Sequence, residues 1–360
     1  MSALEGIAKR TRYTHLWIPA FLAWRLRRLR LRPPRHLWLV IADHYEPLWR
    51  GADEETARTR VALWRRQWPE IASRHVDAEG RRPVYTFFYP EEEYRPELLE
   101  PLAEMTDQGI ADVEVHIHHD GDGADRFQEK IRGFLDTLHQ RHGLLRTEGD
   151  RLVFGFIHGN WALDNSRPDG RWCGLDNEIS ILRDLGCYAD FTMPAADSPC
   201  QAGPVNVIYR VTDDPSRPRS HSRGTPLEPG SSDGGDLTLI PGPLGPDFAS
   251  RGPLRPRIEC GEIAGYRPSS PRRAQLWLEL APRVGDHAFL KLFTHGTQER
   301  NSAVLLRGGL DRLFQDLAGA CAAAGARLHF ASAWDAWRAV EALRRREDPL
   351  GTQSTSPTDR

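Results

Sequence analysis

Histidine or carboxylate side chains stand at or near the ends of five separate apolar runs in this sequence. The runs span residues 36–44, 113–120, 152–158, 188–192 and 289–296. A buried strand needs an apolar body, and it has no reason to end in imidazole unless its end faces a shared polar site. In barrels of alternating strands and helices, the carboxyl ends of the strands converge on one mouth where chemistry is done. The five endings therefore predict an active site, and their imidazoles predict that it holds a metal.

The segment His116-Ile-His118 offers two metal ligands on one predicted strand. Because successive strand residues point to opposite faces, the two imidazoles project to the same side, about 7 Å apart along the chain. They can share a first-row divalent metal with ligands from neighbouring strand ends, and His44 is the expected third ligand. The alternative is a pair of packed or polar histidines. We expect one divalent ion, with zinc as the preferred metal, at His44, His116 and His118.

Two further residues extend the metal hypothesis. His119 falls on the opposite side of this strand or beyond its end, and it is the reserve ligand if the strand twists there. Asp120 could hold a ligand imidazole by its second nitrogen, as outer-shell carboxylates commonly do.

The catalytic groups are expected at the same strand ends. An open position on the metal would carry water and lower its pKa toward neutrality. A carboxylate beside that position, Asp43 or Glu46, could act as the base. An imidazole from the far wall, His295, could protonate the leaving group.

Substrate contacts are predicted at His158, Asn160, Trp161 and Asp190. The glycine between His158 and Asn160 permits close approach, and the asparagine supplies hydrogen bonds. The indole can stack on a sugar face, although simple core packing explains Trp161 alone equally well.

The bulk composition fits one globular α/β domain. The chain has 360 residues, of which 39% are hydrophobic and 27% are charged, values that fit one elaborated barrel. A formal net charge of −2 gives no general reason to bind nucleic acid. Its five cysteines contain no Cys-x-x-Cys pair, so a disulfide framework or a zinc ribbon is not expected.

Strand-like and helix-like runs alternate along most of the chain. Seven or eight such units in series predict a parallel sheet closed into a barrel over residues 36–346. Residues 213–270 are crowded with Pro, Gly and Ser, and we interpret them as a long loop inserted beside the mouth. Residues 347–360 form a polar tail that we expect to be disordered.

Residues 1–35 form a basic, amphipathic N-terminal segment. The apolar stretch 16–24 is too short to cross a bilayer. Its arginines follow the apolar stretch, which is the reverse of a signal peptide. We therefore expect a cytoplasmic protein without a signal peptide or transmembrane helix. Residues 16–35 could lie on the inner face of an anionic membrane, or they could form a helix packed under the barrel floor.

The succession of motifs resembles the polysaccharide deacetylase superfamily, as a divergent member. The resemblance rests on 41–47 (Ile-Ala-Asp-His-Tyr-Glu-Pro), 115–120 (Val-His-Ile-His-His-Asp), 156–161 (Phe-Ile-His-Gly-Asn-Trp), 291–295 (Lys-Leu-Phe-Thr-His) and the closing 328–337 segment. It implies a distorted (β/α)7 barrel and metal-dependent removal of acetyl groups from N-acetylated sugars.

The resemblance also assigns roles. Asp43 would be the base, and His44 stands where the family usually has a metal-binding aspartate. The family's His-x-x-x-His motif falls near His116 but reads His-x-His-His here, so the second ligand is His118 or His119. His295 corresponds to the late acid, followed by glycine in place of the usual aspartate. The family's Arg-x-Pro-Tyr block has no clean counterpart.

Three functions remain open at this point. The first is a metal-dependent hydrolase that deacetylates a carbohydrate during polysaccharide biosynthesis. The second is a glycoside hydrolase of a related barrel type, which needs two carboxylates at the mouth from Asp43, Glu46 and Asp190. The third is a catalytically idle carbohydrate-binding or scaffold protein.

Overall fold

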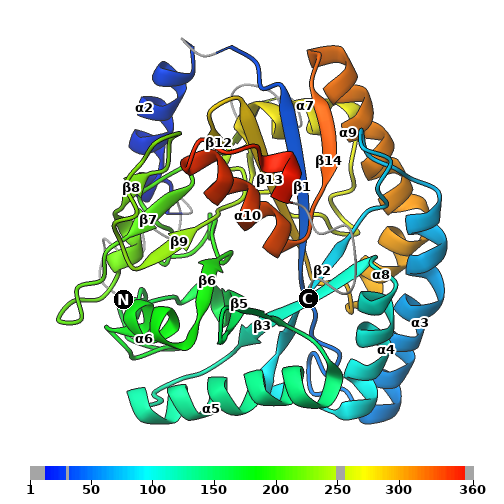
Figure 1. Cartoon of the computed structure of the whole chain (residues 1–360), viewed down its shortest axis with the longest axis vertical. Helices are drawn as coiled ribbons and strands as arrows, with labels where there is room; N and C mark the ends of the chain where they lie inside the picture. The colour runs from blue at the N-terminus through cyan, green and yellow to red at the C-terminus, as the bar shows by residue number, and fades with distance from the viewer. Residues whose placement is uncertain (1–12, 30–31, 249–255, 353–360) are drawn as a thin grey trace.

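A computed structural model describes residues 13–29, 32–248 and 256–352 of the chain. A 12-stranded sheet lies at the centre and is flanked by helices (Figure 1). The protein is therefore an α/β protein with a mostly parallel central sheet, as the alternating sequence pattern predicted.

The sheet follows the order β12-β13-β1-β2-β3-β5-β6-β9-β7-β8, with β14 also on β1 and β4 on β5. Neighbours from β13 to β9 run parallel, whereas β12, β7 and β8 pair antiparallel. Within the described ranges the path does not return to its first strand, so backbone pairing does not close the sheet. The strands are β1 (His36–His44), β2 (Tyr85–Pro90), β3 (Ala111–Ile117), β4 (Arg146–Glu148), β5 (Arg151–His158), β6 (Cys187–Asp190), β7 (Tyr209–Val211), β8 (Thr225–Pro226), β9 (Leu237–Leu239), β12 (Arg283–Val284), β13 (His287–Thr294) and β14 (Arg327–Phe330), and β10 (Gly245–Asp247) and β11 (Arg257–Glu259) form a separate pair.

The helices connect successive strands and begin or end where the sequence signals predict. Asp53 caps α3 through a hydrogen bond from Thr56 N, and Gly186 ends α6 in the left-handed region. Ser332 and Asp335 form a reciprocal capping box on α10. The helices are α2 (Ile18–Arg28), α3 (Glu54–Ser73), α4 (Pro96–Asp107), α5 (Ala124–Asp136), α6 (Glu178–Leu185), α7 (Pro271–Leu280), α8 (Glu299–Val304), α9 (Leu310–Ala324) and α10 (Ala333–Arg344).

Alternate residues of the central strands face two different apolar cores. On the face of the sheet that α3 covers, which we call the helix face, Leu39 and Ile41 pack in one cluster with Trp64 of α3. On the opposite face, which we call the α10 face, Val40 packs in a second cluster with Val340 of α10. This alternation matters for function, because it also divides the polar residues at the strand ends between the two faces.

Three regions differ from the sequence expectation. Residues 213–270 are not all outside the sheet, because β9 lies between β6 and β7. Its three residues are too few to show a period within a Pro- and Gly-rich stretch. The helix-like run over 302–324 falls in two helices, because Arg307 and Gly308 are non-helical and separate α8 from α9. Of the expected disordered tail, 349–352 form a short 3-10 helix, and 353–360 lie outside the described residues.

Helix α2 contains most of the apolar stretch that the sequence shows at residues 16–24. Trp17 and Trp24 face inward and are buried. Ile18, Leu22 and Leu26 face outward along the helix and are exposed. No helix in the described part of the chain is both long and apolar enough to cross a membrane. Residues 1–12 of the predicted N-terminal segment lie outside the described ranges.

Candidate metal centre

Five polar side chains meet at the carboxyl ends of β1, β3 and β13 on the α10 face. They come from the last residue of β1, the loop after it, the end of β3 and the turn after β13. Parallel pairing of β1 with β13, and of β3 with β2 beside β1, brings these ends to one edge. We call them the strand-end cluster: His44, Glu46, His116, His118 and His295.

Glu46 is the common member of this cluster. Its Oε1 lies 3.4 Å from His116 Nε2 and 3.7 Å from His118 Nε2. The ligand atoms of these three residues lie within 4.8 Å of one another, and so do those of His44, Glu46 and His295. The ring of His44 lies 4.8 Å from that of His295 and 5.1 Å from that of His116, measured between centroids. The predicted ligands His44, His116 and His118 are thus brought together, with Glu46 between them.

In His116 and His118, the Nδ1 atom of the ring already has a hydrogen-bond partner outside the cluster. His116 Nδ1 donates to the carbonyl oxygen of Ile157 at 2.8 Å, and His118 Nδ1 lies 2.5 Å from Glu92 Oε1. Both Nε2 atoms therefore face Glu46, and His116 Nε2 is buried without a hydrogen-bond partner. A backbone carbonyl or a carboxylate on the second nitrogen is the usual setting of metal-binding histidines. A divalent metal fits this donor set.

Burial and mutual repulsion set the charges of the cluster. Burial and the neighbouring His295 and His116 hold the pKa of His44 well below its usual value. Burial also lowers the pKa of His295. Burial disfavours the charge of Glu46, but His116 and His295 outweigh it and lower the pKa of that carboxyl. Neutral imidazoles beside an ionised carboxylate are the forms that bind a cation.

His118 differs from the other histidines of the cluster. Burial disfavours its charge, but the hydrogen bond and the charge of Glu92 outweigh burial and raise its pKa. Its side chain is 33% exposed, whereas that of His116 is fully buried. His118 therefore lies at the rim of the cluster, on the side that solvent reaches.

Asp43, predicted as the base, lies on the helix face and not in the strand-end cluster. Its carboxylate accepts hydrogen bonds from Gly296 N at 2.7 Å and Tyr85 Oη at 3.0 Å. Burial raises its pKa to about 7. A side chain on residue 296 would collide with the Asp43 carboxylate, which explains the glycine after His295. Strand alternation sends Asp43 and His44 to opposite faces, so Asp43 positions the turn that carries His295.

The predicted substrate residues separate into two groups. The ring of Trp161 lies 6.3 Å from that of His44, and Asn160 and Trp161 both adopt left-handed backbone angles beside the cluster. Asp190 is buried and accepts hydrogen bonds from the Thr192 amide and hydroxyl. His158 does not line this side of the sheet, because its side chain is fully buried on the helix face.

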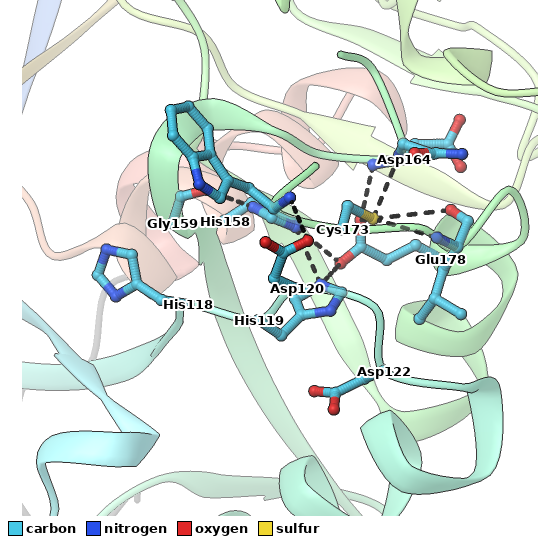
Figure 2. Close-up of polar contacts among 12 residues, drawn as sticks. His118, His119, Asp120, Asp122, His158, Gly159, Asp164, Cys173 and Glu178 are labelled. Carbon is cyan, nitrogen blue, oxygen red and sulfur yellow. Dashed lines mark hydrogen bonds and ion pairs between the residues drawn. The ribbon is translucent and has the colours of Figure 1, made fainter. Parts of the chain in front are cut away.

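A second group of ligand-type side chains, not expected from the sequence, lies on the helix face. Figure 2 shows that His118 and His119, although consecutive, point to opposite sides, and that His119 points toward Glu178. We call this group the buried cluster: His119, His158, Cys173 and Glu178. Asp120, expected to hold a ligand imidazole, accepts a hydrogen bond on its Oδ1 from Trp172 N at 2.8 Å.

A third group lies near the amino end of β1, at the end of the sheet opposite the strand-end cluster. Asp77, Glu79 and His329 are close enough to share an ion. However, Arg81 pairs with Asp77 at 2.9 Å, and Arg327 pairs with Glu79. Their charges are already balanced by arginine, so an ion-pair network accounts for this group.

Comparison with known proteins gives no family for the chain. No protein-family model matches the sequence, and no curated protein matches it. The function must therefore be argued from the residues and from their geometry.

Proposed function

We propose that the protein is a metal-dependent hydrolase that removes acetyl groups from an N-acetylated sugar or polysaccharide. The observation that carries the proposal is the buried, unpartnered Nε2 of His116, which faces Glu46 among further imidazoles. A divalent ion, with zinc preferred, would be held by Glu46, His116 and His118, with His44 adjoining. When bound, it would supply Lewis acidity to an amide carbonyl and would activate water.

The remaining chemistry falls to protein side chains. His295 is held neutral near pH 7 by burial, so it can accept a proton from the attacking water. The same imidazole can then return that proton to the leaving nitrogen. Asp43 fixes Gly296 and thereby orients His295. Asp43 acts in this scheme as a positioning residue.

A sugar substrate is supported by the wall beside His44. Trp161 is only partly buried, and its indole can stack on a sugar ring while Asn160 offers hydrogen bonds. The left-handed angles of both residues place them in a sparsely populated backbone region, which is common at ligand sites.

We also propose that the sheet curves into the expected barrel. The support is that Lys291 Nζ of β13 donates to Phe191 O beyond β6, across the unpaired sides of the sheet.

The glycoside hydrolase alternative is less well supported. It needs two carboxylates facing one sugar. Of the three expected candidates, Asp43 lies on the helix face and Asp190 is bound by Thr192. Glu46 alone lies in the strand-end cluster, and its neighbours there are imidazoles.

The test is metal analysis combined with acetate release from N-acetylglucosamine oligomers. His116→Ala should abolish both the metal at the strand-end cluster and deacetylation. His295→Ala should keep the metal and slow turnover by about 10²–10⁴-fold, the usual loss for a general acid or base. His139→Ala changes an exposed histidine in the π-helical turn that follows α5 and serves as the matched control. Full activity in His116→Ala would refute the catalytic site and favour a carbohydrate-binding protein.

We also propose that α2 docks on an anionic membrane surface. Leu22, Leu26 and Leu29 are 55%, 67% and 74% exposed and follow one side of the helix. Beside them is a cavity of about 480 Å³ whose lining includes Arg25, Arg28, Arg32 and Arg283, with Glu279 paired to Arg25 as the one acidic residue among them. The Nε of Arg283 is buried without a hydrogen-bond partner, and burial with the nearby Arg28 lowers the pKa of Arg283 to about 9. The arginines of this pocket could bind the phosphate of a lipid headgroup, and the exposed leucines beside it could contact the acyl chains.

Liposome cosedimentation tests this membrane proposal. Binding should require phosphatidylserine and should weaken as salt rises, because exposed charges are screened. Arg28→Glu and the double change Leu22→Ser with Leu26→Ser should each reduce binding. No binding at all would leave α2 as a packed helix only. Equal binding to phosphatidylcholine vesicles would overturn the preference for an anionic surface.

A further inference from the structure

The structure assigns a second metal site to the buried cluster: we propose that His119, His158, Cys173 and Glu178 hold a structural zinc ion. The four residues offer one ligand atom each within 4.8 Å of one another, and all four are buried. This site goes beyond the proposed function and does not depend on it.

The spacing of the ligand atoms matches tetrahedral zinc. His119 Nε2 lies 3.0 Å from His158 Nε2 and 3.1 Å from Glu178 Oε1, and His158 Nε2 lies 3.3 Å from the same oxygen. Zinc bonds of roughly 2.0–2.1 Å in a tetrahedron place neighbouring N and O ligands about 3.3 Å apart. One zinc ion can therefore occupy the space between these atoms with small movements of the rings.

Too few protons are present to satisfy these atoms without a cation. His158 Nδ1 donates to Gly159 O at 2.6 Å, so its Nε2 carries a lone pair that faces the cluster. Glu178 Oε1 faces both imidazoles, at 3.1 Å from His119 Nε2 and 3.3 Å from His158 Nε2, while Glu178 Oε2 accepts the Asp164 amide. A single proton on His119 Nε2 can bridge only one of these two acceptors. A metal ion satisfies all three atoms together.

The sulfur of Cys173 is prepared by the backbone around it. Its Sγ accepts hydrogen bonds from Asn165 N at 3.3 Å and Leu175 N at 3.5 Å. The thiolate is the form that binds zinc, so metal binding must release the thiol proton. Zinc with one thiolate, one carboxylate and two neutral imidazoles has no net charge, which suits a site away from water.

The surrounding chain holds the four residues in place. Asp120 Oδ1 accepts from Trp172 N, and Gly121 N donates to Cys173 O at 3.1 Å, which joins the loop after β3 to the cysteine loop. The ring of Phe127 in α5 lies 4.6 Å from that of His119. Glu178 Oε2 accepts the Asp164 amide at 2.6 Å. A closed site with four protein ligands indicates a structural ion that ties α6 to β3 and β5.

Zinc analysis of the full-length protein tests the assignment. His116→Ala should still hold about one zinc per chain, and adding Cys173→Ser or Glu178→Gln should reduce this to none and lower the Tm. If the strand-end proposal is wrong, His116→Ala simply keeps the zinc content of the wild type, so the two proposals fail separately. Cys321→Ser changes another buried cysteine, outside every group of ligand-type residues found in the described ranges, and should leave the zinc bound.

Cobalt substitution provides a readout that does not need any substitution within the buried cluster. Cobalt-loaded His116→Ala should show an ultraviolet sulfur-to-cobalt charge-transfer band, because Cys173 is one of the ligands. A zinc-free His116→Ala after reconstitution, or bound cobalt without a sulfur band, would overturn the proposal. A Tm that chelators do not change in this variant would also overturn it, and would identify the cluster as a hydrogen-bonded network only.

Discussion

His118 and His119 are adjacent in sequence, yet they belong to two clusters that differ in solvent exposure, in the face of the sheet on which they lie and in the types of ligand atom they offer. The strand-end cluster reaches solvent at its rim, where the side chain of His118 is 33% exposed. The buried cluster lies on the helix face, where the side chains of His119, His158 and Glu178 are fully buried. One strand end therefore supplies ligands to an accessible site and to an enclosed one.

The difference teaches what each arrangement can do. A set of imidazoles around one carboxylate that solvent reaches at its rim, through His118, can exchange water with bulk solvent, which catalysis by a metal requires. An enclosed set that includes a thiol and a carboxylate supplies four protein ligands and leaves no open position. We therefore expect activity to depend on the first cluster and stability to depend on the second.

Gly159 lies between the two clusters and gives the sharpest test of their independence. A Cβ at this position would strike the His118 ring and the Ile117 carbonyl oxygen. Gly159→Ala should therefore displace His118 and reduce deacetylation by about 10- to 100-fold, since small misplacements of positioned groups have effects of this size. The zinc of the buried cluster should remain, because His158 precedes the collision and faces the other way.

A matched control is Gly133→Ala in the last turn of α5, which continues into a π-helical turn; the added Cβ there meets no atom within 4 Å. This change should leave activity intact and should stabilise the helix slightly, by about 0.5–1 kcal/mol. Loss of the buried zinc in Gly159→Ala, with activity retained, would show that the two clusters have been assigned the wrong roles.

The strand-end cluster was largely predictable because strands have a period of two residues. That period places His116 and His118 on one face and sends His119 to the other. The same rule also separates Asp43 from His44. Asp43 was expected to be the base because it stands at the strand end and because of the family resemblance. Neither argument applied the strand alternation, and the structure places this carboxylate on the helix face.

The buried cluster could not be read from the sequence. The run before His158 is apolar on both faces, so it gives no sign of the face to which His158 points. Cys173 and Glu178 come from a loop and a helix start whose positions depend on left-handed residues such as Asp164 and Trp172. The sequence pattern specifies the strands and most helices, but it does not specify how such a loop folds back onto a strand end.

The smallest expected effect is a loss of stability at acid pH that does not depend on metal. It comes from histidines that stay neutral in the folded protein. Three such residues, which we call the floor histidines, meet at the amino end of the sheet: His36, His287 and His329. Burial lowers the pKa of His287 to about 4 and that of His329 to about 3. His287 also accepts a hydrogen bond from Trp38 Nε1 at 3.0 Å, which requires the neutral ring.

The sign of the pH effect follows from these values. Between about pH 6.5 and pH 4 the unfolded chain protonates these histidines while the folded protein does not, so stability must fall as the pH falls. Each histidine contributes a slope of up to about 1.4 kcal/mol per pH unit within that range. Thermal unfolding of the chelator-treated protein between pH 7.5 and pH 4.5 should show this fall with no metal bound. His287→Asn keeps an acceptor for Trp38 without a titrating ring, so its Tm should fall less steeply with acid. A steep fall in the metal-loaded protein that vanishes after chelation would instead place the whole acid sensitivity in the metal clusters, because only their ligands would then be competing with protons.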